Sequence, residues 1–174
     1  MSEAREFKVV GTRVVRPDGV DKVTGRATFG ADFSLPGMLY AKVLRSPHAH
    51  ARIKNIDTKR AAAIEGVHAI VTGADFPSVG HEAITGGEGA GDFADLATNI
   101  MARDKVVYHG HAVAAVAAKT PAIADAALAA IKVQYEVLKP VMDLDTAMAA
   151  GATLIDERLF TEGLPEKPAK PSNV

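Results

Sequence analysis

The sequence contains no cysteine among its 174 residues. Disulfides, thiolate zinc sites, iron–sulfur ligation by this chain and a cysteine nucleophile are therefore excluded. An excess of one charge is also missing, because 20 Lys and Arg stand against 21 Asp and Glu, a net charge of -1. With no basic field to neutralise phosphates, nucleic acid is not an expected partner.

Long hydrophobic runs are lacking as well. No apolar segment is long enough to span a bilayer, and the opening MSEAREFKVV is charged and has no apolar signal-peptide core. The Ala-rich stretch 112–130 is broken by Lys119, Thr120 and Pro121, which favours a strand, a turn and a packed helix. We expect a cytoplasmic protein with no membrane partner.

The residues that are present have an ordinary globular balance, 48% hydrophobic and 24% charged. A chain of this length suits one compact domain. We predict a single α+β domain over residues 1–156. The remaining residues, 157–174, are rich in Pro, Lys and Glu and are predicted to form a linker or tail.

Turn residues and apolar patterning predict a small mixed or antiparallel sheet. The expected strands are 38–45, which follows a Pro36–Gly37 turn, then 51–56, 67–71, 105–108, 112–118 and 132–137. Segment 112–118 is apolar throughout, so we expect it at the centre. In segment 132–137, Val133, Tyr135 and Val137 should form the buried face. Chain reversals are expected at Gly25, Gly37, Gly66 and Gly110.

Three helices are predicted. A short one over 58–64 begins at Asp57 or Thr58 and ends before Gly66. The second opens at Thr120–Pro121, with an inward face predicted from the spacing of Ile123, Ala126, Ala127, Ala130 and Ile131. A third, over 144–150, is closed by Gly151.

The stretch from Pro77 to Asn99 has no consistent period and is predicted to be one long loop, functional or disordered. It contains GGEGAG at 86–91, which invites comparison with phosphate-binding loops. No register gives G-x-G-x-x-G, and no Lys follows as in a P-loop. A flexible loop is therefore favoured.

Two His-x-His pairs, His48 with His50 and His109 with His111, are the candidate metal ligands. Residues at i and i+2 of an extended chain share a face, but a metal site needs three or four convergent ligands. Hydrogen-bonded loop histidines are the favoured reading, with a metal site as the alternative. Ser46, Thr24 and Asp32 suggest no triad, and turn and capping roles suffice for them. We assign no catalytic, cofactor-binding or metal-binding residue.

Several motifs resemble the large subunit of molybdenum hydroxylases of the xanthine dehydrogenase and aldehyde oxidase family. KVTG, LPGMLY and RSPHAHARI lie between Lys22 and Thr58, and GVHAIVTGAD, DKVVYHGHAVAAVAA and AALAAIKVQYEVL follow in family order. The resemblance covers nearly all of the chain before its tail. It implies an N-terminal α/β-hammerhead domain, an incomplete β-meander flanked by helices, which packs against the iron–sulfur portion and two large cofactor-binding domains.

The function that this resemblance implies is structural and docking support for an oxidoreductase of aldehydes, N-heterocycles or aromatic thioesters. Molybdopterin, [2Fe-2S] and FAD would lie on other domains or subunits, because the family's pterin-binding glycines and base glutamate lie beyond the hammerhead region. The chain alone would be inactive and expose an apolar docking face. Its expected partners are the remaining molybdopterin-binding domains or subunit and the iron–sulfur subunit, with a flavin subunit as a further candidate.

Three points stay open at the level of sequence. The segment from Ser78 to Asn99 would, by the resemblance, border the substrate entrance. A second hypothesis is a stand-alone hammerhead-fold module that binds a small ligand or a partner protein. A stand-alone hydrolase is a third, which no nucleophile–base pattern in the sequence supports.

Overall fold

The computed structural model describes residues 7–78, 83–85, 90–161, 165 and 168–173. The chain forms two compact units, Met1–Met38 and Leu39–Val174. The first contains the short helix α1 (Gly19–Val23) and the 3-10 turn η1 (Gly30–Asp32), neither of which was predicted. None of the described residues of this unit is buried.

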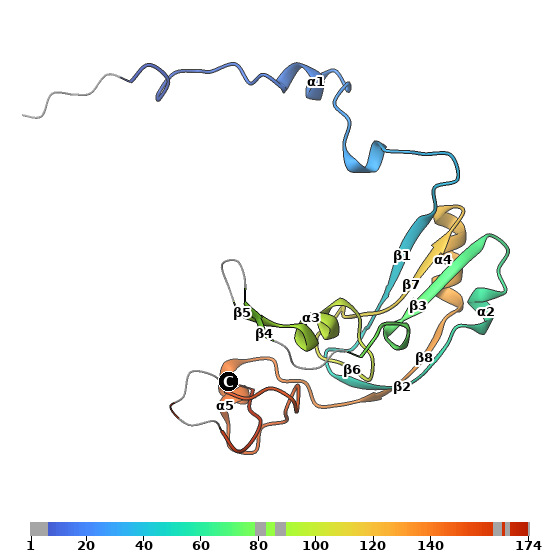
Figure 1. The fold of residues 1–174 in the computed structure, drawn as a ribbon, viewed down its shortest axis with the longest axis vertical. Coiled ribbons are helices and arrows are strands. Elements are labelled where there is room, and N and C mark those ends of the chain that lie inside the picture. Colours follow the sequence, from blue (N-terminus) through green and yellow to red (C-terminus); the bar gives the residue numbers. More distant parts are fainter. Residues whose placement is uncertain (1–6, 79–82, 86–89, 162–164, 166–167, 174) are drawn as a thin grey trace, which may run out of the picture. The chain divides into compact units, whose positions relative to one another are not determined.

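Two three-stranded antiparallel sheets form the second unit (Figure 1). The first has the order β1-β7-β3 and consists of β1 (Tyr40–Arg45), β7 (Ala112–Ala118) and β3 (Val67–Thr72). The second has the order β6-β2-β8 and consists of β6 (Lys105–Val106), β2 (Ala51–Asp57) and β8 (Lys132–Val137). The predicted α+β class is confirmed, and the described strands pair antiparallel.

Strand β7 lies at the centre of the first sheet, as its apolar sequence predicts. It contributes Ala114, Val116 and Ala118 to the larger core cluster and Val113 to a second cluster formed with Ala51, Ala102 and Val106. One strand therefore joins the two cores.

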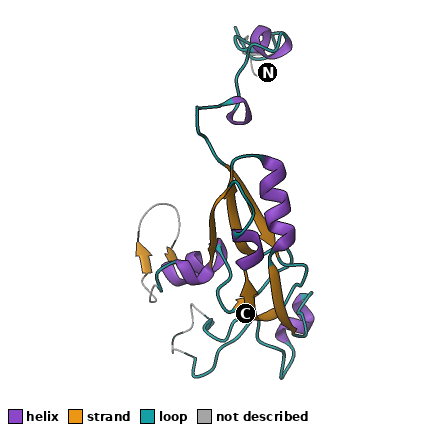
Figure 2. Ribbon diagram, turned by 90° about the vertical axis from the view of Figure 1, so that its right-hand side faces the viewer, coloured by secondary structure: helices purple, strands orange, loops and turns teal. Residues whose placement is uncertain are grey.

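Helix α4 (Pro121–Ala130) lies along one face of the first sheet (Figure 2). Thr120 caps it, because its Oγ1 accepts a hydrogen bond from Ile123 N at 3.2 Å. The predicted inward face needs a correction, since Ala126 is exposed and Ala124 is buried. The helix is alanine-rich on every side, so spacing alone does not fix which side meets the sheet.

The prediction of one loop over 77–99 is wrong. Strands β4 (Ala83–Thr85) and β5 (Ala90–Asp92) pair with each other, and helix α3 (Phe93–Ile100) follows. The helical signal is present in the sequence, where Phe93, Leu96, Ala97 and Ile100 are spaced i, i+3, i+4 and i+7. The glycine-rich stretch before it masks that signal.

Other element boundaries shift by a few residues. Helix α2 (Lys59–Ala62) is shorter than predicted, and the Asp57 carboxylate accepts from Lys59 N at 3.0 Å. Helix α5 (Leu144–Met148) ends two residues before Ala150. Strand β6 stops at Val106, before the predicted Tyr108. Val137 was expected to be buried but is 61% exposed, because it lies at the end of β8.

The predicted turns are confirmed. The peptide after Pro36 reverses with Gly37 at φ +79°, and Met38 N donates to Leu35 O at 3.1 Å. Gly110, at φ +85°, makes the bend before β7. Both conformations are strained for residues that have a Cβ.

Replacing Thr120 by alanine is expected to lower the free energy of unfolding by about 1 kcal/mol, because Ile123 N loses its side-chain acceptor. Urea unfolding followed by circular dichroism measures the change. Thr120→Ser is the matched control and should stay close to the wild type. Equal stability of Thr120→Ala and the wild type would contradict the capping role.

Candidate functional site

Backbone hydrogen bonds join the two predicted histidine segments into one structure, the histidine junction (residues 45–50 and 108–111). Ser46 N donates to His111 O, and Gly110 N donates to Ser46 O, both at 2.9 Å. The Arg45 guanidinium donates to Gly110 O at 2.9 Å. The junction therefore links the end of β1 to the bend that precedes β7.

His50 and His111 are buried in this junction, and their rings bond to backbone. His50 is 2% exposed, and its Nδ1 lies 2.9 Å from Lys139 O, just beyond β8. Because a carbonyl accepts only, Nδ1 carries a proton and donates. Among the described residues, His50 Nε2 is a buried nitrogen without a hydrogen-bond partner.

The His111 ring fastens α3 to the first sheet. Its Nε2 donates to Thr98 O at 2.7 Å, and its Nδ1 accepts from Val107 N at 3.3 Å. These partners fix the neutral ring with its proton on Nε2. Tyr108 stacks on the ring at a centroid distance of 4.3 Å and donates its hydroxyl to Asn99 O at 3.2 Å. Two carbonyls in the last turn of α3 thus receive side-chain donors.

Burial lowers the pKa of His111 below its ordinary value of 6.5, and the hydrogen bond to Thr98 O acts in the opposite direction. Burial likewise raises the pKa of Tyr135, and a hydrogen bond with Ser46 opposes that rise. The His48 ring meets Tyr135 edge-on at 5.0 Å. Burial therefore favours the neutral forms of His111 and Tyr135.

A metal centre does not fit these residues. In the described part of the chain no group of three or more His, Cys, Asp or Glu side chains gathers to hold an ion. The prediction of hydrogen-bonded histidines is confirmed for His50 and His111. An iron–sulfur cluster would lack its usual thiolate ligands here, because the chain has no cysteine.

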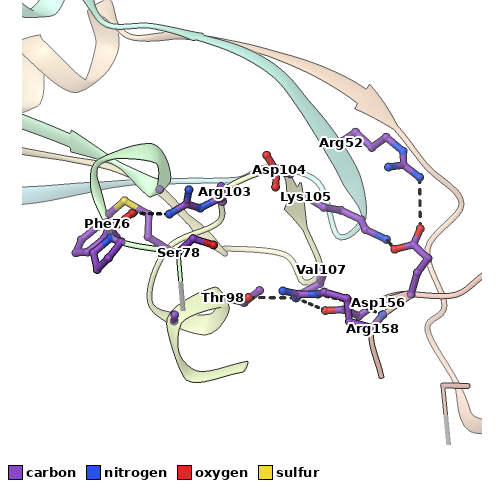
Figure 3. A pocket seen from close by; sticks show the side chains of 15 residues that line it. Arg52, Phe76, Ser78, Thr98, Arg103, Asp104, Lys105, Val107, Asp156 and Arg158 are labelled. Carbon is purple, nitrogen blue, oxygen red and sulfur yellow. Dashed lines mark hydrogen bonds and ion pairs between the residues drawn. The ribbon is translucent and has the colours of Figure 1, made fainter. Parts of the chain in front are cut away.

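Both partners of the His111 ring, Thr98 and Val107, line a cavity of about 320 Å³ (Figure 3). Phe76 and Met101 supply apolar surface to it. The other wall is ionic, and residues from β2, β6 and the segment after residue 155 form it: Arg52, Lys105, Asp156, Glu157 and Arg158. Arg103 and Asp104 also line the cavity, and Arg103 donates a hydrogen bond to Phe76 O on the apolar side.

Most of these charges are matched within the wall. Glu157 lies 2.5 Å from Lys105 and 3.3 Å from Arg52, and the Lys105 hydrogen bond is the main cause of its lowered pKa. Arg52 and Lys105 are directly opposite each other on β2 and β6, where two like charges would repel. The Glu157 carboxylate lies beside both cations and offsets part of that repulsion. Arg158 pairs with Asp156 at 2.5 Å and donates to Thr98 Oγ1 at 3.1 Å.

The described lining of the cavity is rich in charged and polar groups. None of the fifteen described lining residues is a histidine, and the hydroxyl groups among them belong to Ser78 and Thr98. These described residues therefore include no nucleophile paired with an imidazole base. Sequence reasoning missed this cavity because its walls come from segments far apart in the chain. One signal becomes visible once β2 is known to pair with β6: Arg52 and Lys105 then lie opposite each other, which indicates a nearby anionic side chain.

The remaining candidates have the structural roles predicted for them. Ser46 Oγ accepts from His48 N at 3.0 Å, Thr24 Oγ1 donates to Val20 O at 2.7 Å, and Asp32 accepts from Phe29 N at 2.9 Å. Of GGEGAG, residues 86–89 lie outside the described residues, and Ala90 and Gly91 belong to β5. No helix in the described part of the chain is long and apolar enough to cross a membrane.

Comparison with known proteins identifies relatives along most of the chain. Residues 24–139 match the family described as aldehyde oxidase and xanthine dehydrogenase, a/b hammerhead domain. The chain is 41% identical over 143 residues to a probable subunit of xanthine dehydrogenase from Bacillus subtilis, covering 82% of this chain and 18% of that protein. It is 38% identical over 146 residues to the nicotinate dehydrogenase large molybdopterin subunit of Eubacterium barkeri, covering 83% and 32%.

Solved structures agree with this. The aldehyde oxidoreductase from Desulfovibrio desulfuricans matches with a TM-score of 0.70 at 31% identity, over 84% of this chain and 17% of that chain. The reconstituted CO dehydrogenase from Oligotropha carboxidovorans matches with a TM-score of 0.68 at 35% identity, over 82% and 17%. The chain thus spans between about a fifth and a third of the length of these relatives.

The lowered pKa of His111 predicts a pH-dependent stability. In the unfolded chain this histidine has its ordinary pKa and takes up a proton near that pH. In the folded chain His111 is protonated only at lower pH. The free energy of unfolding should therefore fall as the pH drops below about 6.5, and the fall should end once the pH is below the pKa of His111 in the folded chain. Urea unfolding between pH 8 and pH 5 measures this loss.

His111→Gln keeps a donor for Thr98 O but cannot titrate, so it should show a smaller loss over the same pH range. His109→Gln, at an exposed position of the same segment, is the control and should keep the wild-type slope. A wild-type slope in His111→Gln would contradict the assignment.

Proposed function

The chain belongs to the aldehyde oxidase and xanthine dehydrogenase family, as its a/b hammerhead domain, and from this premise we propose that it is a structural and docking domain of a molybdenum-dependent oxidoreductase. The family match over residues 24–139 carries the proposal. The complete enzyme would oxidise an aldehyde, an N-heterocycle or an aromatic thioester. The names of relatives, which refer to xanthine, nicotinate and aldehydes, support the first two of these substrate classes.

The residues of the chain support a role without a redox centre. Cysteine is absent, and the buried rings of His50 and His111 are bonded to backbone carbonyls. Molybdopterin, which supplies the redox chemistry where it is bound, would be held by other domains or subunits, and so would [2Fe-2S] and FAD. The chain alone would be inactive.

The proposed partners are the remaining molybdopterin-binding domains or subunit, the iron–sulfur subunit and a flavin subunit. Residues 1–156 would form the hammerhead domain, and residues 157–174 would lead to the molybdopterin-binding domains. Glu157 and Asn173 both bond back to the domain, Asn173 through Ile155 N and Thr153 O at 2.9 Å. A tail held in this way would leave the domain in a defined direction. The cytoplasm remains the proposed compartment.

The segment from Ser78 to Asn99 would border the substrate entrance of the assembled enzyme. Its two described ends support this, because Ser78 and Thr98 both line the cavity in Figure 3. A second candidate function, a stand-alone module that binds a small ligand, is favoured by the same cavity, whose volume lies at the lower end of small-molecule sites.

Co-expression with the proposed cofactor-binding portion distinguishes these functions. A tagged copy of this chain should capture that portion, and the complex should contain molybdenum. The chain purified alone should be colourless, with no stoichiometric molybdenum, iron or flavin in elemental analysis and an absorbance scan. A stoichiometric redox centre on the isolated chain would contradict the docking role, and so would a failure to capture the cofactor-binding portion.

A further inference from the structure

The two faces of the first sheet have different surroundings. Successive side chains of a strand point to opposite faces, so the strand register sorts the residues into rows. Leu44, Val116 and Ile70 pack in the core cluster that includes Ala124 and Ala127 of α4. That face is closed by the helix.

The opposite face contains two complete rows across the three strands. Ala117 pairs with Ala41 on β1 and with Ala69 on β3, and Ala115 pairs with Val43 and Val71 in the same way. All six residues of this alanine–valine face are Ala or Val: Ala41, Val43, Ala69, Val71, Ala115 and Ala117. Ala41 and Ala69 are exposed, and Val43 is 41% exposed.

No charged side chain occupies these two rows. Arg45 follows a register shift after Leu44, and its guanidinium donates to Gly110 O at 2.9 Å, in the histidine junction. Lys42 belongs to the α4 side of the strand, where it pairs with Asp125 at 3.1 Å. The nearest cations of β1 are thus bonded elsewhere, and the face stays apolar.

The second sheet of the same unit has a face that is exposed to solvent, and its composition differs from that of the alanine–valine face. Along β8, Lys132, Gln134 and Glu136 are exposed and alternate with partly buried Val133 and Tyr135. Sheets with one face in water normally show this alternation, whereas strands apolar on both sides occur in sheets covered on both faces. β7 is apolar on both sides. Its composition is that of a strand with a layer over each face.

We propose that the cofactor-binding portion of the large subunit covers the alanine–valine face. This inference rests on the proposed function and names its docking surface. The small side chains leave room for a helix or sheet to approach closely, and the matching surface would carry branched aliphatic residues without charges.

The small area of the face favours docking of a layer on the same polypeptide over dimerisation with a second copy of the chain. Three strands about 4.8 Å apart give a width of about 10 Å, and the two rows lie about 7 Å apart. Such a patch is far smaller than the roughly 800 Å² per partner that a stable dimer needs. A layer on the same polypeptide docks at millimolar effective concentration, so a small patch suffices. The relatives supply that layer, because this chain spans 17% to 32% of their length.

Cysteine labelling tests the inference, because this chain has no cysteine of its own. Ala69→Cys places a thiol on the face, and Ala129→Cys places one on an exposed position of α4 as the matched control. In the 174-residue chain both thiols should react with a maleimide at similar rates. In the complete large subunit, the Ala69→Cys thiol should react at least about tenfold more slowly, with Ala129→Cys unchanged. Peptide mass spectrometry identifies the labelled residue.

Equal labelling of Ala69→Cys in the chain and in the complete subunit would overturn the inference. Slow labelling already in the isolated chain at micromolar concentration, accompanied by dimers on size-exclusion chromatography, would also overturn it in favour of self-association. The molybdenum content of the same subunit preparation tests the proposed function separately. A molybdenum-containing subunit with a reactive Ala69→Cys would reject the docking face alone, whereas absence of molybdenum would reject the proposed function.

Discussion

The burial of β7 is the constraint on which the rest of the second unit depends. A strand of alanine and valine alone forms no polar contact through its side chains, so it is stable only when strands pair on both edges and other layers exclude water. β1 and β3 satisfy its edges, and α4 covers one face. The small side chains of Ala114 and Ala118 let the alanine-rich side of α4 lie close to the sheet.

The polar groups at the start of β7 must then be satisfied without water. Buried donors and acceptors that lack partners cost about 1–3 kcal/mol each, and the ring of His111 has a partner for each of its nitrogens. His111, immediately before the strand, bonds on one side to Val107 N and on the other to Thr98 O. His111, one of the four candidate metal ligands of the sequence, therefore holds the start of the central strand in place. Its burial follows from its position next to β7.

Local features of the fold were predictable because their causes are local. The Pro36–Gly37 turn, the Thr120 cap and the apolar run of β7 each depend on neighbouring residues, and the structure has them where the sequence indicates. The rotation of α4 was not predictable, since Ala124 and Ala126 differ only in what lies beside them. The charged cavity was not predictable either. It depends on β2 and β6 placing Arg52 opposite Lys105, and on Glu157, which is 52 residues from Lys105 and 105 from Arg52, pairing with both.

The side chains of the ionic wall and of the alanine–valine face are both suited to structural contacts. In the ionic wall Glu157 pairs with both Arg52 and Lys105, so the start of the tail is joined to the β2–β6 strand pair. On the face, neither alanine nor valine offers a group that could orient a substrate or move a proton. A surface of that composition gains free energy only by excluding water against another apolar layer. Packing against another apolar layer is therefore the contribution that the residues of the alanine–valine face can make.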